Sequence, residues 1–158
     1  MSRRDQIRMT DEEVASFLLE QRVVTCASIG PDGRPHLMPL WFVPDGDTLL
    51  AWTYAASQKA KNLRRDPRAT LQIESGDSYE ELRGVMFEAD TDLIEAPEEV
   101  GAIGLRLTLR YAPGDLTPES APSELRDFVA AQARKRVALR FRPTRTVSWD
   151  HRKLAGTY

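Results

Sequence analysis

The sequence predicts one domain over residues 1–158 that is mainly β, a small antiparallel barrel with helices inserted among its strands. The chain has 158 residues, enough for a single hydrophobic core. Roughly six segments have the composition of strands, rich in β-branched and aromatic residues. Tight-turn signals, at Gly30-Pro31-Asp32-Gly33 and Pro44-Asp45-Gly46-Asp47, separate the first three. Such turns join antiparallel neighbours, whereas parallel strands need long crossovers.

The first part of the chain is expected to contain one helix and three strands. Residues 2–9 are polar and are expected to lack regular structure. Thr10, with Glu13 three residues later, forms a capping box, which predicts a helix over residues 11–20. The predicted strands cover residues 22–29, 34–43 and 48–53. Because tight turns join them, these strands should form an antiparallel meander.

A basic helix is predicted after the third strand. Ser57 is a suitable N-cap, and Asp66-Pro67 should end the helix because a residue before proline avoids the α region. One acid accompanies the cations of this stretch, which are Lys59, Lys61, Arg64, Arg65 and Arg68. The free N–H groups and partial positive charge of a helix N-terminus attract a phosphate or another compact anion, and lysines strengthen this attraction. The alternative is a basic helix face that only contacts water.

The remaining segments are predicted to be three strands and two helices. The strands cover residues 69–74, 82–93 and 136–149, the helices begin at residues 96 and 123, and an irregular segment covers 111–122. The apolar faces of the helices are expected to be Val100, Ile103 and Leu107 in one and Leu125, Phe128 and Val129 in the other. Pro143 should bend or bulge the last strand, because proline cannot donate to a ladder.

The composition excludes several function classes. A formal net charge of −2 argues against a general nucleic-acid binder and, with the local basic helix, favours a small anionic ligand. The single cysteine, Cys26, lies in an apolar strand and is expected to be a buried, reduced thiol. No apolar run reaches the roughly 18 residues of a membrane span, and no signal peptide is recognisable. A soluble cytoplasmic protein is therefore expected.

No self-contained catalytic set is recognisable, so the catalytic residues stay unknown. His36 and His151 are the only histidines, and neither has a cysteine or an acid at ligand spacing, so no metal site is expected. Nucleotide-loop and serine-hydrolase motifs are absent. A chain with so little chemistry of its own is expected to rely on a cofactor.

Four segments resemble the pyridoxamine 5′-phosphate oxidase-like flavin and deazaflavin superfamily, and most of all its coenzyme F420-dependent branch, the split β-barrel deazaflavin oxidoreductases of actinobacteria. These segments are Gly33–Phe42, Trp52-Thr53, Ser57–Arg68 and Ser148–Leu154. The resemblance rests on the Ser-x-Lys-x-x-Asn-Leu-x-x-Asp-Pro pattern together with the Pro-x-Trp-Phe strand. It implies an FMN-binding-type split barrel, a Greek-key antiparallel barrel, that forms a homodimer with two cofactor sites at the subunit interface.

The resemblance also implies cofactor-binding roles. It places Met38, Pro39, Leu40 and Trp41 along the ring system of the cofactor, and Thr53, Ser57, Lys59 and Lys61 at its phosphate. Asn62 would fix the start of the helix or reach the ligand; the alternative is an amide on the helix surface. The alternative for Leu40 and Trp41 is ordinary strand core. Pro39 is better explained by a place where the backbone meets a ligand, since it cannot donate to a ladder.

The favoured cofactor is coenzyme F420, with FMN as the alternative. FMN ends in one phosphate, whereas F420 carries a phosphodiester and a polyglutamate tail, which the arginines after Lys61 suit better. The implied activity is hydride transfer from the reduced deazaflavin to an electron-poor small molecule. The proton source is open between Tyr54, His36 and solvent.

Other functions and roles stay open. One is an FMN-dependent oxidase or flavin reductase on the same barrel, and another is a non-catalytic protein that binds or stores F420. A haem-binding split barrel is disfavoured because histidines are scarce. The segment Tyr111–Pro122 is either a lid over the site or a plain connector. Trp149 and the tail His151–Lys153 either lie near the interface, over the site of the other subunit, or form a frayed basic C-terminus.

Overall fold

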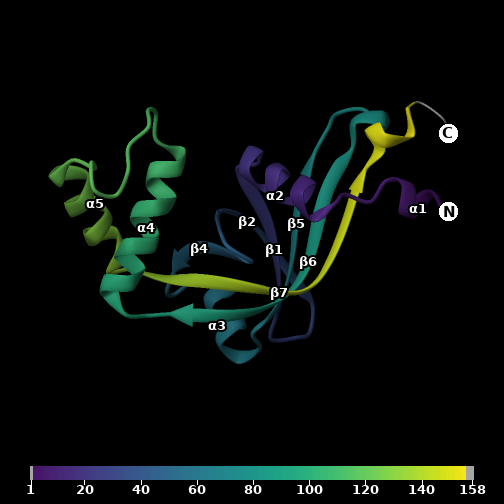
Figure 1. Cartoon of the computed structure of the whole chain (residues 1–158). Coiled ribbons are helices and arrows are strands. Elements are labelled where there is room, and N and C mark those ends of the chain that lie inside the picture. The colour runs from purple at the N-terminus through teal and green to yellow at the C-terminus, as the bar shows by residue number, and fades with distance from the viewer. Residues whose placement is uncertain (1, 156–158) are drawn as a thin grey trace.

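A seven-stranded antiparallel sheet, curled into a half-barrel, forms the centre of the molecule (Figure 1). The computed structural model describes residues 2–155. The strands are β1 (Val23–Ile29), β2 (Pro35–Trp41), β3 (Val43–Asp45), β4 (Thr48–Tyr54), β5 (Arg68–Ser75), β6 (Arg83–Ile94) and β7 (Arg136–Asp150). They lie in the order β2-β1-β5-β6-β7-β4-β3. The predicted mainly β fold is confirmed, and β4 lying beside β7 of the β5-β6-β7 meander is the Greek-key arrangement.

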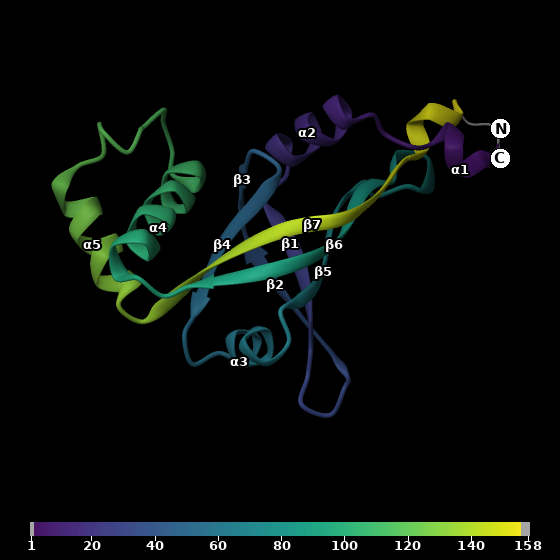
Figure 2. The same cartoon turned by 60° about the horizontal axis from the view of Figure 1, so that its bottom comes forward.

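Helices occupy the ends and one side of this sheet. They are α1 (Arg3–Gln6), α2 (Asp11–Glu20), α3 (Gln58–Arg65), α4 (Pro97–Tyr111) and α5 (Ser123–Ala133), with short 3-10 helices η1 (Tyr79–Glu81) and η2 (His151–Leu154). Figure 2 shows α2 and α3 at opposite ends of the sheet, with α4 and α5 forming an arm beside it. No helix within residues 2–155 is both long and apolar enough to cross a membrane. The expected cytoplasmic location stays a prediction.

The predicted helix caps are confirmed. The Thr10 hydroxyl accepts the Glu13 N–H at 3.2 Å, and the Glu13 carboxylate accepts the Thr10 N–H at 2.7 Å. The Ser57 hydroxyl accepts the Ala60 N–H at 3.2 Å at the start of α3. Asp66 follows the last residue of that helix in an extended conformation, as a residue before proline should.

The predicted meander of the first three strands is wrong. The strand expected over 34–43 is interrupted at the buried residue Phe42, where the chain passes from one edge of the sheet to the other. β4 therefore pairs with β7 instead of β2. Its neighbouring residues Leu49 and Leu50 are both buried, on opposite faces, which suits a strand covered on both sides. The turn at Gly46 was predicted correctly and joins β3 to β4.

The predicted distortion at Pro143 is confirmed. Glu88 pairs with Arg145, but the next residue, Ala89, pairs with Pro143, so β7 contributes one extra residue, Thr144, at this point. Such a bulge bends the strand and increases its twist. It helps the 15-residue β7 to follow both the half-barrel and the arm of helices.

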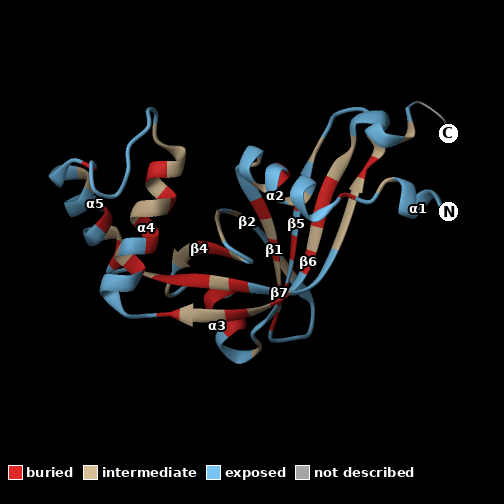
Figure 3. Ribbon diagram, viewed as in Figure 1, coloured by how far each residue is buried: buried red, intermediate tan, exposed pale blue. Residues whose placement is uncertain are grey.

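Two clusters of buried apolar side chains hold these parts together (Figure 3). The larger one fills the half-barrel and includes Phe17, Phe42 and Phe141. The smaller one lies beneath α4, where the expected core residues of that helix are buried: Val100, Ile103 and Leu107. The expectation for the next helix is confirmed at Val129, which is buried, and is wrong at Phe128, which is 59% exposed because α5 packs through Val129 and Ala133.

The N-terminal segment and the C-terminal tail lie together and are more ordered than expected. The Asp150 N–H donates to the Ile7 carbonyl at 2.7 Å, and Lys153 forms an ion pair with Glu13 at 2.5 Å. Residues 2–9 contain α1, so the absence of regular structure expected there is wrong. The alternative of a frayed tail is also wrong for residues 148–155, whereas residues 156–158 of that tail lie outside the described residues.

Candidate functional site

The half-barrel is open along a line between β2 and β4. β2 is one edge of the sheet, and β3 covers only Thr48–Leu50 of β4, so the rest of β4 has no strand on that side within residues 2–155. β2 lies close to β4 without forming a ladder with it. α3 follows directly from the end of β4, so its N-terminus is placed at this opening. This is the place where several of the predicted site residues meet.

The N-terminus of α3 brings three predicted residues together. The Thr53 and Ser57 hydroxyl oxygens are 3.3 Å apart, which links the end of β4 to the helix cap. Two residues later, Lys59 turns inward and is only 5% exposed. Hydroxyls, a lysine and the first N–H groups of a helix are the groups that proteins use to hold a phosphate.

The side chain of Lys59 is almost completely buried and has no balancing charge among the described residues, although its Nζ keeps some contact with solvent. Its Nζ forms no hydrogen bond or ion pair with any residue that the structure describes. Burial lowers the pKa of Lys59, and the nearby Cys26 raises it slightly. Burial also raises the pKa of the Cys26 thiol to about 11, so the thiol stays neutral and does not compensate the cation. A buried cation with no partner is costly, and a bound anion would remove that cost.

The predicted roles of Lys61 and Asn62 have different outcomes. Lys61 is exposed on α3, where it is available to a ligand. Asn62 is fully buried, so the alternative of a surface amide is wrong. Its amide donates to the Ser28 hydroxyl at 3.1 Å and accepts a hydrogen bond from Gln58 at 2.8 Å. Asn62 therefore fixes the first turn of α3 to β1.

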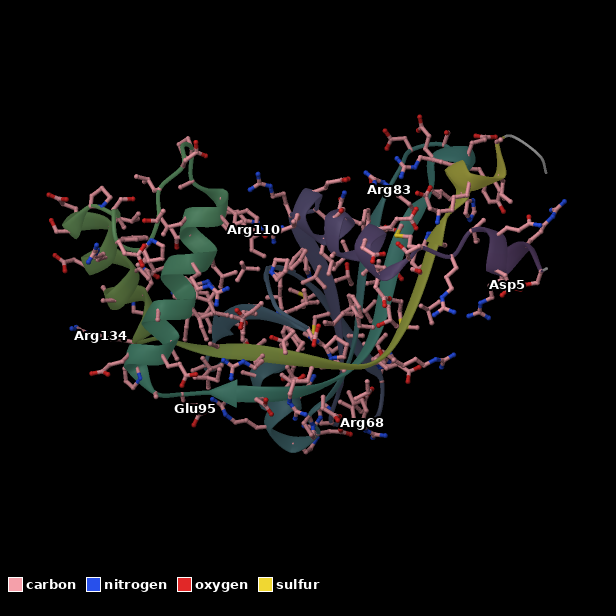
Figure 4. The ribbon with its side chains drawn as sticks, viewed as in Figure 1. Asp5, Arg68, Arg83, Glu95, Arg110 and Arg134 are labelled. Carbon is pink, nitrogen blue, oxygen red and sulfur yellow. The ribbon has the colours of Figure 1, made fainter. Side chains whose placement is uncertain are left out.

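The arginines of the basic run are occupied within the chain. Arg64 forms an ion pair with Glu95 at 2.7 Å, and Arg68 forms one with Asp66 at 2.7 Å. Figure 4 shows Arg68 and Glu95 beside α3. Arg65 donates to the Ile29 carbonyl. The sequence argument that these arginines suit a longer polyanion therefore loses much of its force, and the two lysines remain.

The four predicted residues of β2 do not share one face. Pairing with β1 sets Met38 opposite Cys26, so Met38 is the residue of β2 that lies nearest to the Lys59 environment. Leu40 lies on the same face and packs against the barrel core. Pro39 and Trp41 lie on the opposite face of the strand. Because β2 is an edge strand, Pro39 is tolerated there without any ligand.

Trp41 belongs to a cluster that the sequence did not reveal. Its ring stacks on the ring of Tyr111, with centroids 4.1 Å apart and planes 3° apart. Trp41 is nevertheless 55% exposed, so the alternative of ordinary strand core is wrong for it. Tyr111 lies about 70 residues away in the chain, and no local pattern connects the two residues.

Neither proposed proton source is distinguished by its surroundings. His36 lies on the same face of β2 as Met38, and its Nδ1 is buried without a hydrogen-bond partner among the described residues. Tyr54 is 54% exposed at the end of β4, and the guanidinium of Arg136 lies 4.3 Å above its ring. Within residues 2–155, no group of three or more histidines, cysteines and acids could hold a metal ion.

A cavity of about 370 Å³ opens at the same end of the sheet, but it is separate from the predicted site. It lies over β1, β5 and β6 and is lined by small side chains, including Ala27, Ala69 and Ala89, with Arg68 at its rim. None of the nine predicted cofactor residues lines it. The unpaired edges and the buried cation at α3 remain the more specific indication of a ligand site.

Comparisons with protein families and with solved structures agree with the observed fold and indicate which protein family the chain resembles. A sequence model of the pyridoxamine 5′-phosphate oxidase family matches residues 10–150. The conserved hypothetical protein Rv2991 from Mycobacterium tuberculosis is 39% identical, with a TM-score of 0.86 over 100% of this chain and 95% of that one.

An F420 reductase is 26% identical, with a TM-score of 0.62 over 83% of this chain and 93% of that one. The haem storage protein HutZ from Vibrio cholerae is 16% identical, with a TM-score of 0.67 over 87% of this chain and 94% of that one, a likeness that concerns the fold alone. The similar structures thus include proteins of the flavin and deazaflavin split barrels.

Proposed function

The chain belongs to the pyridoxamine 5′-phosphate oxidase family, and from this premise we propose that it is an oxidoreductase that binds coenzyme F420. The substrate would be an electron-poor small molecule. When bound, the reduced deazaflavin supplies the hydride. The observation that carries the proposal is the buried side chain of Lys59 at the N-terminus of α3, whose ammonium has no hydrogen-bond or ion-pair partner among residues 2–155.

The residues around α3 fit the phosphate of such a cofactor. Lys59 would supply a fixed charge, Lys61 a second charge from the exposed side, and Thr53 and Ser57 would supply hydroxyls. Asn62 acts indirectly, since its hydrogen bond to Ser28 fixes the helix that presents these groups. Burial strengthens the interaction of Lys59 with an anion because the local dielectric constant is low.

The apolar side chains of β2 fit the ring system. Met38 is 46% exposed on the face of β2 toward Lys59, and Trp41 presents an aromatic surface on the opposite face, where it would meet the ring of a cofactor held by a second subunit. Their role would be to bind and orient the ring and to exclude water from it. Among the described residues, no acid or base lies in a position that assigns the proton transfer.

A second subunit is part of the proposal. The outer face of the β1–β2 hairpin exposes apolar side chains that a single chain leaves in water: Val23, Leu37, Pro39 and Trp41. Exposed apolar surface of this kind is typical of an interface. We infer a homodimer in which each cofactor lies near the opening of one half-barrel and is covered by the other subunit.

FMN is the second candidate cofactor, and a specific observation favours it. Arg64 and Arg68 are paired with acids and Arg65 donates to the Ile29 carbonyl, so the two lysines are the cations at α3 with no partner among the described residues, and one phosphate is enough to satisfy them. A non-catalytic F420-binding protein is the remaining candidate. It would bind F420 with the same residues and reduce no acceptor.

Fluorescence titration with F420, run in parallel with FMN, tests the proposal. We expect saturable binding of F420 that is weakened at least about tenfold in the Lys59→Ala, Lys61→Ala double variant, because a charge-assisted hydrogen bond contributes about 1.5–3 kcal/mol. Arg64→Ala with Arg68→Ala is the matched control, which removes two positive charges from the same helix region and should change the affinity little. An equal loss in both variants would indicate a diffuse charge effect and contradict a defined site.

The two titrations also decide between the cofactors, and a separate turnover assay tests the activity. Binding of FMN alone would move the protein to the flavin branch, and binding of neither cofactor would overturn the proposal. Where F420 binds, a panel of enones, quinones and nitro compounds is added to the reduced cofactor and its oxidation is followed by absorbance. Tight binding with no turnover on the whole panel would favour the non-catalytic candidate.

A further inference from the structure

The last turn of α4 is fastened to the end of β2, where Trp41 lies. The Tyr111 hydroxyl accepts the Phe42 N–H at 3.0 Å and donates to the carbonyl of Phe42 or Arg22. Phe42 and Arg22 directly follow β2 and precede β1, respectively. These bonds leave the Tyr111 ring little freedom to move relative to the sheet.

Arg110 strengthens the same attachment. Its guanidinium donates to the Leu18 carbonyl at 2.7 Å and the Gln21 carbonyl at 2.8 Å at the end of α2, and also to the Phe42 carbonyl. Figure 4 shows Arg110 between α4 and α2. The group has no carboxylate partner within residues 2–155, and burial lowers its pKa. Two consecutive residues of α4 thus bind three separate parts of the half-barrel.

Trp41 gains its orientation from this attachment. An exposed tryptophan at the end of an edge strand would otherwise change rotamer freely. Here one face of the indole is covered by the nearly parallel ring of Tyr111, while 55% of the residue remains accessible. The pair therefore presents a fixed aromatic plane with one face open, at the end of the strand proposed to contact the cofactor ring.

We propose that Tyr111 is a positioning residue that holds the Trp41 ring, on the outer face of β2, in the plane against which the ring system of a cofactor at the subunit interface stacks. The proposal rests on the proposed function. It makes the last turn of α4 part of the site. Offset stacking of aromatic rings depends on their relative orientation, so an indole that is already oriented binds a flat ring with a smaller loss of freedom.

A double-mutant cycle on F420 affinity tests the proposal, with Trp41→Leu, Tyr111→Leu and the combined variant. We expect each single change to weaken F420 binding about tenfold, and the combined variant to bind no more weakly than Trp41→Leu alone, because Tyr111 acts through Trp41. Inorganic phosphate should compete with F420 for binding. The inhibition constant of phosphate, calculated with the F420 affinity of each variant, should be the same in every variant. Phe128→Leu, a change at another exposed aromatic residue, is the control and should leave the affinity unchanged.

The conservative variant Tyr111→Phe separates positioning from folding. It keeps the stacked ring and loses only the hydroxyl, so it should recover F420 affinity to within about threefold of the unmodified protein. Circular dichroism melts show whether Tyr111→Leu is folded at the titration temperature. If that variant is unfolded, the cycle is completed with Tyr111→Phe, whose smaller effect should likewise vanish in the Trp41→Leu background.

Failure of this inference is distinguishable from failure of the proposed function. Additive losses near a hundredfold would overturn the positioning role and leave the Lys59 site unaffected. An equal loss of phosphate and F420 affinity in Tyr111→Leu would also overturn it, because the change would then act on the phosphate site and not on the Trp41 ring. If the unmodified protein binds neither F420 nor FMN, the proposed function fails and this inference fails with it.

Discussion

Lys59 shows how a single residue can indicate a ligand. A lysine on a helix between two strands usually faces water, yet this one is 5% exposed and has no acid within reach among the described residues. The neighbouring residues of the same basic run behave in the usual way, since Arg64 and Arg68 are exposed and paired with acids. The buried position, more than the charge of the run, distinguishes a site from a solvated helix face.

Replacing Lys59 by methionine should stabilise the protein without ligand while it weakens anion binding. The side chains have similar volume, and the change removes a buried charge, so we expect the free energy of unfolding to rise by about 1–3 kcal/mol at neutral pH. The measurement is urea denaturation, with Lys61→Met as the control on the exposed side. A large destabilisation by Lys59→Met would mean that the chain itself satisfies this ammonium.

The same residue gives the stability a defined pH dependence. Since burial lowers the pKa of Lys59 in the folded state, the unfolded chain binds more protons between that lowered pKa and its own pKa of about 10.4. Stability relative to Lys59→Met should therefore increase as the pH rises through this window, and the difference should disappear near its upper end. Comparing the two proteins largely cancels the opposite contribution of Cys26, whose pKa is raised. A difference that stays constant from pH 7 to 10 would contradict a depressed pKa.

At the scale of elements, the position of α4 depends on a close contact between helix and sheet. A side-chain Cβ at Gly104 would lie 2.2 Å from the Trp52 ring, whereas one at Gly101 would lie 4.0 Å from the nearest heavy atom, in Ala133. The two glycines belong to the same helix and differ mainly in this distance. They offer a direct test of how tightly α4 must pack for the protein to work.

Gly104→Ala and Gly101→Ala should therefore have opposite effects. Overpacking against Trp52 should lower the free energy of unfolding by about 1–3 kcal/mol in Gly104→Ala, even after the gain in helix propensity. Gly101→Ala should raise it by up to about 1 kcal/mol, because alanine is the better helix former. Chemical denaturation measures both, and equal effects would show that the Gly104 contact relaxes easily.

Local signals predicted the elements well, and long-range contacts explain the errors. The caps at Thr10 and Ser57 and the bulge at Pro143 depend on neighbouring residues, so the sequence contains all the information needed. The pairing of β4 with β7 joins residues 82 to 92 positions apart, and turn signals say nothing about it. Helix α5 begins at the predicted residue and buries the predicted Val129, but Phe128 is exposed, because the position of α4 decides which residues of α5 are covered.

At the candidate site, too, the features that depend on neighbouring residues were predicted and those that depend on long-range contacts were not. The basic run and its cap were found from the sequence because they are contiguous. The partner of Arg64 lies 31 residues away at Glu95, and the partner of Asn62 lies 34 residues away at Ser28, so the sequence could not show which polar groups were already satisfied. The stacked pair of Trp41 and Tyr111 was missed for the same reason.

At the scale of the whole molecule, the exposed face of the β1–β2 hairpin predicts assembly. Leu37 is 58% exposed on that face. We expect the unmodified protein to be a dimer and Leu37→Asp to be a folded monomer, because a charge at the centre of an apolar interface is left unpaired on association. Light scattering coupled to size-exclusion chromatography measures both, with Leu19→Asp, at another exposed leucine on α2, as the control. A monomeric unmodified protein would contradict the interface.

The backbone hydrogen bond between Asp150 and Ile7 has a consequence for circular permutation of the chain. It holds the two described ends of the polypeptide side by side, at the end of the sheet remote from α3 (Figure 1). A short linker between these ends, with new termini opened in the exposed segment 113–120, would leave every strand pairing unchanged. A circularly permuted protein of this kind would keep the same half-barrel while its synthesis began with α5 and ended with α4.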